Sequence, residues 1–298
     1  MRVGCIVNPT AGWGRGTVIG RLLESVLTEL GIEHRIVATD RPGQAADLAR
    51  RLLGQGWDCL AVVGGDGTFS QVAAVAAGGP VPIALVPAGT GNAMARALGV
   101  DGSRRGLEAV FRAPVRRDID TAAINGHPFF ALAGIGFDAQ LVRSLRRSPL
   151  LPRTAGYVVT GLLQLGKLRP FDLRLESAGA PYERGRALCL AVCNGPFYGA
   201  GLPVAPAAEL TDGRLDFCLL DDVPVPELPL VGAALLRGRH ALRADVHAWQ
   251  GTALRVETDP PVPWHADGEP GGLTPAAVEL RPVRLGLLVP PGSRLDRT

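Results

Sequence analysis

An aspartate stands in the middle of a glycine-rich stretch, GGDGT, at residues 64–68. The apolar run CLAVV before it predicts a buried strand, and FSQVAAVAA after it predicts a helix. Gly64, Gly65 and Gly67 would let backbone N–H groups approach a ligand closely, and Thr68 would cap the helix, whose N-terminus attracts anions. Asp66 would repel a phosphate directly, so we expect it to act through Mg²⁺ or through water bound to the metal. The alternative is a turn aspartate that hydrogen-bonds to its own backbone.

Two more loops of small residues follow predicted strands in the same part of the chain. One is NPTAGWGRGT, which begins at Asn8, and the other is the stretch VPAGTGNAMAR around Thr90. The hydroxyls of Thr10 or Thr17 and of Thr90 could bind phosphate oxygens. Ligands of parallel sheets bind at the carboxyl ends of the strands, so three such loops predict a phosphate site at one edge. They are named here the Asn8 loop (8–14), the Asp66 loop (64–68) and the Thr90 loop (88–92).

Two familiar phosphate-binding patterns are absent from the sequence. It has no G-x-x-x-x-G-K-[ST] motif, and its one lysine, Lys167 in LGKLRP, cannot serve as the strand lysine of a protein kinase. The stretch GWGRGT is only a broken dinucleotide fingerprint.

A second pair of acids stands near the other end of the chain, in WHADGEP. Asp267 and Glu269 flank a glycine and could supply a general base and a metal contact. The alternative is a β-turn with two solvated carboxylates.

Strands and helices alternate from the start of the chain to about Thr121, which predicts a parallel sheet covered by helices. Strands dominate afterwards, with helical stretches at 137–147, 154–168 and 226–236. We therefore expect an α/β domain over 1–121 and a β-rich domain over 122–289, with a tail at 290–298 that can pack back on the first domain.

The composition of the chain also limits which classes of function and which cellular locations we expect. The formal net charge of +3 is too small to argue for nucleic acid. The five cysteines have no disulfide spacing and mostly lie in apolar runs, which indicates core residues in a reducing compartment. Neither a signal peptide nor a 20-residue apolar span is recognisable, so we expect a cytoplasmic protein, peripheral to the inner face of a membrane at most.

Six stretches together make the pattern specific: NPTAG, GGDGT, PAGTGN, GIGFDA, APAAELTDGRLD and DGE, in this order. They resemble the diacylglycerol kinase catalytic-domain family, which includes bacterial soluble lipid kinases and sphingosine kinases. The resemblance implies a phosphofructokinase-like α/β domain followed by a β-sandwich domain, with ATP and substrate meeting in the cleft between them. It implies an Mg²⁺-dependent kinase that phosphorylates the hydroxyl of a lipid alcohol, and a homodimer.

The resemblance also assigns roles to residues. It implies that Asp66 and Asp120 belong to an acidic network around catalytic Mg²⁺, that Asp267 deprotonates the lipid hydroxyl, and that Glu269 binds nucleotide or metal. A structural metal site would involve Asp212 and the backbone carbonyls of Glu209 and Arg214, although D-G is also a plain hairpin signal. The expected nucleotide-binding residues are Asn8, Thr10, Gly64, Gly65, Asp66, Gly67, Thr68, Gly89, Thr90, Asn92 and Glu269.

One stretch departs from the pattern of the family. Many relatives carry a basic residue before an alanine–tyrosine pair, where this chain has LLPRTAGYVV, with Arg153 and Tyr157 as the nearest match. Two other activities stay open from the sequence: an NAD kinase, and a lipid-binding protein with an inactive site.

Two basic clusters lie beside apolar stretches, a combination that suits anionic lipid surfaces. A solvated helix face is the alternative. The clusters are Arg143, Arg146, Arg147 and Arg153 around SPLLP, and Arg237, Arg239, His240 and Arg243 after LPLVGAALL.

Overall fold

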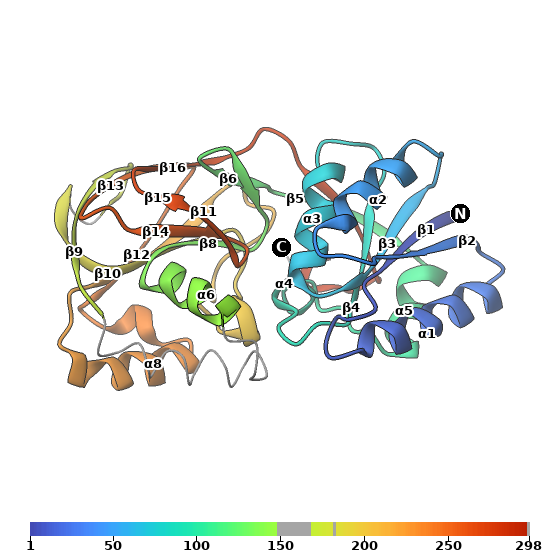
Figure 1. Ribbon diagram of the computed structural model, residues 1–298, viewed down its shortest axis with the longest axis horizontal. Coiled ribbons are helices and arrows are strands. Elements are labelled where there is room, and N and C mark those ends of the chain that lie inside the picture. Colours follow the sequence, from blue (N-terminus) through green and yellow to red (C-terminus); the bar gives the residue numbers. More distant parts are fainter. Residues whose placement is uncertain (148–167, 181–182, 297–298) are drawn as a thin grey trace. The chain divides into compact units, whose positions relative to one another are not determined.

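The computed structural model describes residues 1–147, 168–180 and 183–296 (Figure 1). The chain divides into two compact units. The first comprises Met1–Thr121 and Pro282–Thr298, and the second comprises Ala122–Arg281. Arg153 and Tyr157 lie outside the described residues.

The first unit is a sheet in the order β2-β1-β3-β4-β17-β5, in which β5 is antiparallel to β17 and the other pairs are parallel. Its described strands are β1 (Arg2–Val7), β2 (Glu33–Ala38), β3 (Cys59–Gly64), β4 (Ile83–Pro87), β5 (Val115–Ile119) and β17 (Leu285–Val289). Its described helices are α1 (Arg15–Glu29), α2 (Gln44–Leu53), α3 (Asp66–Ala76), α4 (Ala93–Leu98) and α5 (Arg104–Arg112).

Helices cover both faces of this sheet, α1 and α5 on one side and α2 and α3 on the other (Figure 1). For this reason the central strands β3 and β4 are buried along their whole length and consist almost entirely of apolar residues and glycine. One core cluster joins Leu23 of α1 and Phe111 of α5 to strand residues such as Val63.

Strand β17 reaches the first sheet from the far end of the sequence. It lies between β4 and β5 and pairs Leu285 with Ile119. The sequence analysis had placed this apolar run with the β-rich segment, because it follows other strands. The structure instead uses it to join the last strand of the α/β segment to the parallel sheet.

The second unit is built from antiparallel strands in the order β15-β14-β8-β10-β9-β13-β16-β6-β7. In addition, β11 pairs with β10, and β12 pairs with β11. Its described strands are β6 (Ala122–Ile124), β7 (His127–Phe129), β8 (Leu132–Gly136), β9 (Phe171–Glu176), β10 (Arg184–Cys193), β11 (Leu215–Asp221), β12 (Val246–Gly251), β13 (Ala253–Asp259), β14 (Pro263–Ala266), β15 (Glu269–Leu273) and β16 (Ala276–Leu280). The second unit also contains the described helices α6 (Phe137–Arg147) and α8 (Leu228–Leu236) and the 3₁₀ turns η2 (Gly199–Gly201), η3 (Val225–Glu227) and η4 (His240–Leu242). The 3₁₀ turn η5 (Arg294–Asp296) belongs to the first unit.

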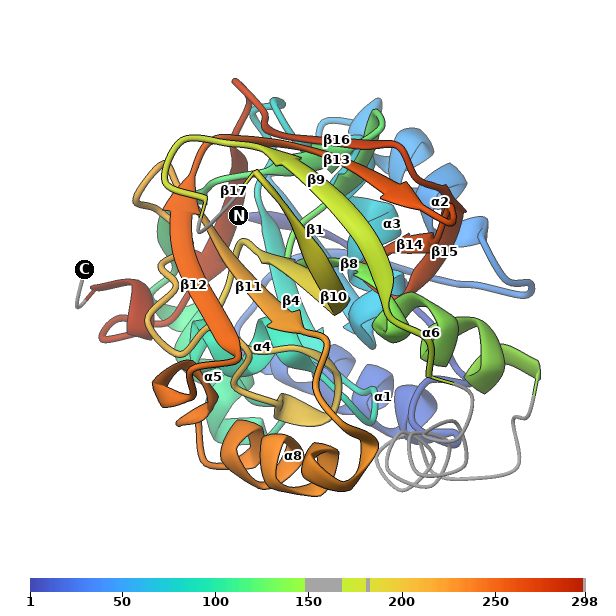
Figure 2. The ribbon, with the colours of Figure 1, turned by 90° about the vertical axis from the view of Figure 1, so that its left-hand side faces the viewer.

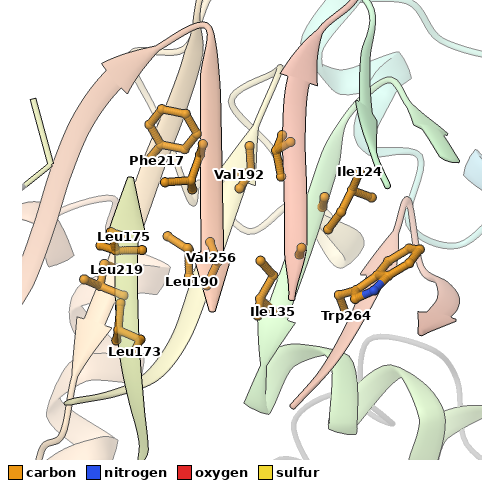
Figure 3. Packing of buried hydrophobic residues seen from close by; sticks show 14 of the residues in the cluster. Ile124, Ile135, Leu173, Leu175, Leu190, Val192, Phe217, Leu219, Val256 and Trp264 are labelled. Carbon is orange, nitrogen blue, oxygen red and sulfur yellow. The ribbon is translucent and has the colours of Figure 1, made fainter. Parts of the chain in front are cut away.

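The strands of the second unit curve around an extended apolar core (Figure 2). In β9, FDLRLE, buried and exposed residues alternate, as they do in a strand with one face on the core. Leu173 and Leu175 of β9 belong to one core cluster with Val256 of the adjacent β13 and Phe217 of β11 (Figure 3). An α/β unit followed by an antiparallel β unit confirms the predicted fold class.

The five cysteines are free thiols in the structure. Burial raises the pKa of Cys5 to about 12 and that of Cys218 to about 11. The other three, Cys59, Cys189 and Cys193, also have raised pKa values because they are desolvated. A thiol that stays protonated is a poor nucleophile, so these side chains act as packing groups.

Glycines allow the loops at the carboxyl edge of the first sheet to pack directly on one another. A Cβ atom on Gly89 would lie 2.5 Å from the Gly65 Cα atom, and one on Gly12 would lie 2.0 Å from the Ala88 carbonyl oxygen. Backbone bonds add to this contact, since the N–H groups of Ala88 and Gly89 both donate to the Gly64 carbonyl. The glycines at these positions therefore bring loop against loop.

Gly89→Ala should destabilise the protein by about 1–3 kcal/mol, because backbone would have to move to admit the methyl group. Gly89 has no positive φ, so the cost is steric. The control is Gly232→Ala in α8, where a Cβ atom would meet nothing within 4 Å; it should be neutral or slightly stabilising. Urea denaturation measures both, and equal stability of the two variants would contradict the packing argument.

Candidate active site

Asp66 is the first residue of α3 and is separated from the end of β3 by Gly65 alone. Its Oδ1 atom accepts a hydrogen bond of 3.3 Å from the backbone N–H of Met94, in the first turn of α4. The carboxylate thus caps α4, the helix that directly follows the Thr90 loop. This contact joins two of the three loops and leaves Asp66 half-buried at the edge of the sheet.

Thr68 does not cap α3, and that expectation was wrong. The helix begins two residues before Thr68, at Asp66, with Gly65 as a cap that makes no side-chain hydrogen bond. The Thr68 hydroxyl instead accepts a 3.0 Å hydrogen bond from Asn8 Nδ2. Asn8 Oδ1 in turn accepts from the backbone N–H and the hydroxyl of Thr10, at 3.2 and 2.9 Å.

The Thr90 loop ends at Asn92, which adopts a left-handed conformation before α4. Asn92 Nδ2 donates to the Gly89 carbonyl at 2.7 Å, while its Oδ1 atom is buried and has no hydrogen-bond partner among the described residues. A buried acceptor without a donor is costly, so this atom fits a ligand that brings an N–H or O–H group. Thr90 lies two residues away and is half-buried.

Hydrogen bonds thus connect several of the predicted nucleotide-site residues within and between the three loops. Gly67, the second residue of α3, directly follows Asp66, and Gly64, the last residue of β3, lies two residues before it. Carboxylate and hydroxyl oxygens at the N-terminus of a helix suit a phosphate-bound Mg²⁺ ion. The donor set of this edge therefore fits the metal and the nucleotide that the sequence implies.

Asp120 follows β5 and is almost completely buried. Its Oδ1 atom forms an ion pair of 3.0 Å with Arg284, and only 4% of its side chain is exposed. The pair joins the residue after β5 to the residue before β17. Nothing in the sequence indicated Arg284, because 164 residues separate it from its partner.

Asp267 and Gly268 form the two-residue turn between β14 and β15, in which Ala266 pairs with Glu269. Both turn residues have positive φ, 47° and 80°, which a tight hairpin turn with Asp-Gly favours. Glu269 opens β15 and is exposed.

The Asp267 carboxylate turns back onto the segment between β7 and β8. Its Oδ2 atom accepts from the N–H of Phe130 at 2.9 Å, and its Oδ1 atom accepts from Ala131 and Leu132 at 2.9 and 3.0 Å. Three backbone donors use most of the acceptor capacity of one carboxylate. Asp267 is thus an anchoring residue, whatever chemistry it also performs.

Asn194 supports the same segment and was not predicted. It is buried, and its Nδ2 atom donates to the Phe130 carbonyl at 2.8 Å. A polar residue directly after the apolar strand ALCLAVC was the signal that could have found it.

Asp212 Oδ1 accepts from the backbone N–H of Arg214 at 2.9 Å, as in an aspartate turn. Burial raises the pKa of the nearby Asp216, and the negative charges of Asp212 and Glu209 raise it further. Three acids therefore repel one another here, which a cation would relieve. In the described part of the chain, no group of three or more His, Cys, Asp or Glu side chains is arranged to hold a metal ion.

Most of the predicted basic residues whose side chains are described have partners in the structure. Arg143 donates to the carbonyls of Gly271 and Gly272, and Arg243 pairs with Asp245 and Glu227. His240 is buried against the carbonyl of Val204. Arg237 and Arg239 are exposed. None of the helices in the described ranges is long and apolar enough to cross a bilayer.

Comparison with known proteins gives two matches in succession along the chain. Residues 2–124 match the diacylglycerol kinase catalytic domain, and residues 131–289 match the YegS C-terminal NAD kinase beta sandwich-like domain.

Individual relatives span nearly the same length. The chain is 30% identical to "Probable lipid kinase YegS-like" of Pseudomonas aeruginosa, with 90% of this chain and 89% of the relative covered. It is 28% identical to a diacylglycerol kinase of Bacillus subtilis, with 92% and 91% covered. A crystal structure of a diacylglycerol kinase from Bacillus anthracis has the same fold, with a TM-score of 0.75, 20% identity and 97% of each chain covered. The predicted resemblance is confirmed: this chain belongs to the diacylglycerol kinase catalytic-domain family, with a C-terminal domain of the YegS type.

Proposed function

We propose that the protein is a lipid kinase that transfers the γ-phosphate of ATP to the hydroxyl of a lipid alcohol, such as diacylglycerol or a sphingoid base. The observation that carries this proposal is the convergence of the three loops on Asp66 at the carboxyl edge of the first sheet. The names of the relatives support a lipid as the acceptor.

The transfer needs charge neutralisation at the phosphates, an in-line hydroxyl and an acceptor for its proton. When bound, Mg²⁺ would neutralise phosphate charge beside Asp66. Because Lys167 is the one lysine of the sequence, arginine and backbone N–H groups supply the remaining positive charge. In this proposal Asn8, Thr90 and Asn92 bind the nucleotide.

The acidic residues of the two units have different roles in this proposal. Asp120, held by Arg284, belongs to the acidic surroundings of the metal. Asp267 accepts the proton of the lipid hydroxyl, and Glu269, exposed on the next strand, binds nucleotide or metal. The Asp267 anchor holds this acceptor at a fixed place on the second unit.

An ATP-consumption assay with a panel of lipid alcohols and NAD, with products read by mass spectrometry, tests the proposal. A phosphorylated lipid supports it and also identifies the acceptor. Phosphorylated NAD, or lipid binding without ATP consumption, would overturn it.

We also propose a peripheral contact with an anionic membrane through α8 and its flanking turns. Only Val231 of α8 is buried. Among the described residues, four of the eight exposed large hydrophobic side chains lie here: Val225 (48%), Leu230 (61%), Leu236 (67%) and Leu242 (84%). Arg237 and Arg239 stand among them and are exposed. Apolar side chains beside arginines suit the boundary between lipid headgroups and acyl chains.

Asp66→Asn should weaken the binding of Mg²⁺–nucleotide and reduce activity, with little change in the stability of the ligand-free protein. The asparagine oxygen can still accept the Met94 hydrogen bond, so the substitution removes mainly the charge. Calorimetric titration with a non-hydrolysable ATP analogue and thermal melting measure the two effects. Unaltered nucleotide affinity would contradict the role of Asp66.

Asp267→Asn should reduce kcat by about 10²–10⁴-fold, the usual contribution of a positioned proton acceptor, and leave nucleotide affinity nearly intact. The remaining oxygen can still accept from Ala131 and Leu132, so much of the anchor is kept. Initial rates and melting temperature are compared. A near-normal kcat, or a loss of rate explained by unfolding alone, would contradict the assignment.

Asp212→Asn should abolish stabilisation by Mg²⁺, because a site that binds only the folded state raises its melting temperature. The variant can still accept the Arg214 hydrogen bond, so the ligand-free protein should melt nearly as before. Melting curves with Mg²⁺ and with a chelator measure this. If the unsubstituted protein melts at the same temperature in both, there is no stabilising metal site.

Replacing Leu236 and Leu242 by serine should lower binding to vesicles, because these exposed side chains would otherwise enter the lipid. Replacing Arg237 and Arg239 by glutamine should lower binding only to anionic vesicles at low salt, by about fivefold for each arginine. Leu273→Ser, at a similarly exposed leucine on β15, is the control. Co-sedimentation with phosphatidylcholine vesicles, with and without phosphatidylglycerol, measures binding. Binding that is indifferent to both sets of substitutions would overturn the proposed surface.

A further inference from the structure

Two polar side chains from separate segments of the second unit meet at one buried histidine. His265, on β14, is completely buried. Its Nε2 atom lies 2.6 Å from Oδ2 of Asp138, in the first turn of α6, and 3.2 Å from the Tyr198 hydroxyl. The Tyr198 ring stacks on the imidazole, with ring centroids 5.5 Å apart and planes inclined by 23°.

The fourth contact of the imidazole is with backbone. The N–H of Gly268 donates to Nδ1 of His265 at 3.2 Å. An N–H group can only donate, so Nδ1 is the acceptor and the ring proton sits on Nε2, where it is donated to Asp138. The surroundings thus fix the tautomer and the orientation of the ring from both ends.

The neighbouring strand is shaped to admit this pair. His265 lies opposite Gly134 in the pairing of β14 with β8. A Cβ atom on Gly134 would lie 2.1 Å from Asp138 Oδ2 and 2.5 Å from His265 Nε2. A side chain at that position would therefore push the histidine and its carboxylate partner apart.

Gly268 stands between Asp267 and Glu269, the two acids to which the proposed function gives roles. The Asp267 side chain is held from one side by the N–H groups of residues 130–132. The Gly268 N–H is held from the other side by His265. A histidine that merely filled the core would need no contact with this turn.

We propose that His265 is a positioning residue for the acceptor chemistry. Backed by Asp138 and Tyr198, it holds the Asp267–Glu269 turn through the Gly268 N–H and so orients the two acids toward the lipid hydroxyl. This inference rests on the proposed function. Misplacement of a catalytic group by about 1 Å can cost about 10²-fold in rate, which sets the size of the effect to look for.

Two substitutions of His265 distinguish the contact that Nδ1 makes with Gly268 from the contacts that Nε2 makes with Asp138 and Tyr198. His265→Asn places an amide oxygen near the position of Nδ1, where it can accept from Gly268. His265→Gln places its amide near the position of Nε2, where it meets Asp138 and Tyr198 but not Gly268. Both variants lose ring volume in the core, and His265→Asn loses more of it, so packing loss would slow His265→Asn at least as much as His265→Gln.

We expect His265→Asn to keep kcat within a few-fold of the unsubstituted enzyme and His265→Gln to lose about 10- to 100-fold, with KM for the lipid little changed in both. Melting temperature should fall at least as far in His265→Asn as in His265→Gln, because asparagine is the smaller side chain. A His265→Gln variant that is folded and as fast as His265→Asn would overturn the proposal.

Hydrogen exchange at the Gly268 amide, followed by NMR without substrate, gives a second readout. Protection should persist in His265→Asn and be lost in His265→Gln. Equal protection in the two variants would overturn the proposed contact. Because this readout needs no turnover, the expected difference in a protein that phosphorylates no lipid would show that the proposed function failed while the positioning contact held.

Discussion

A carboxylate that binds the backbone of a neighbouring segment is the interaction on which both candidate sites depend. Asp66 binds the N–H of Met94 in the first unit, and Asp267 binds three N–H groups after β7 in the second. In each unit an acid with a proposed chemical role also fixes a loop that the sheet alone would leave without support. Hydrogen bonds to a charged group are stronger than those between neutral groups, so they locate the acid as well as the loop.

This double use constrains how each site can vary. An amide in place of the acid keeps part of the hydrogen bonding but removes the charge, while a small apolar residue removes both. Loss of function at these positions therefore mixes two causes, and only variants that preserve the hydrogen bond separate them. The same reasoning applies to Asp120, which is buried although its partner Arg284 is half-exposed, because a buried charge that loses this partner would be costly.

The fold class and the main loops could be predicted from the sequence because they depend on local signals. Buried strands that alternate with helices, glycines after strands and the D-G pair of Asp267 and Gly268 are all visible along the chain. The partners of the acids could not be predicted, because they are distant in sequence. Arg284 lies 164 residues from Asp120, and Phe130 lies 137 residues from Asp267. The glycines of the Asp66 loop were interpreted as room for a ligand, whereas Gly65 also makes room for Gly89. The position of β17 could not be predicted either, because its apolar run suits either sheet and only its pairing with β4 and β5 decides between them.

The place of β17 has a consequence for how the chain acquires its structure. The first sheet has β17 between β4 and β5, so it lacks an interior strand until residue 289 has been synthesised. During translation, the 160 residues of Ala122–Arg281 emerge before that strand does. Until then, one edge of β4 in the N-terminal α/β segment has no partner strand. An unpaired strand edge can pair with strands of other chains. The β-rich unit, in contrast, is contiguous in sequence and can fold as soon as its last strand is free.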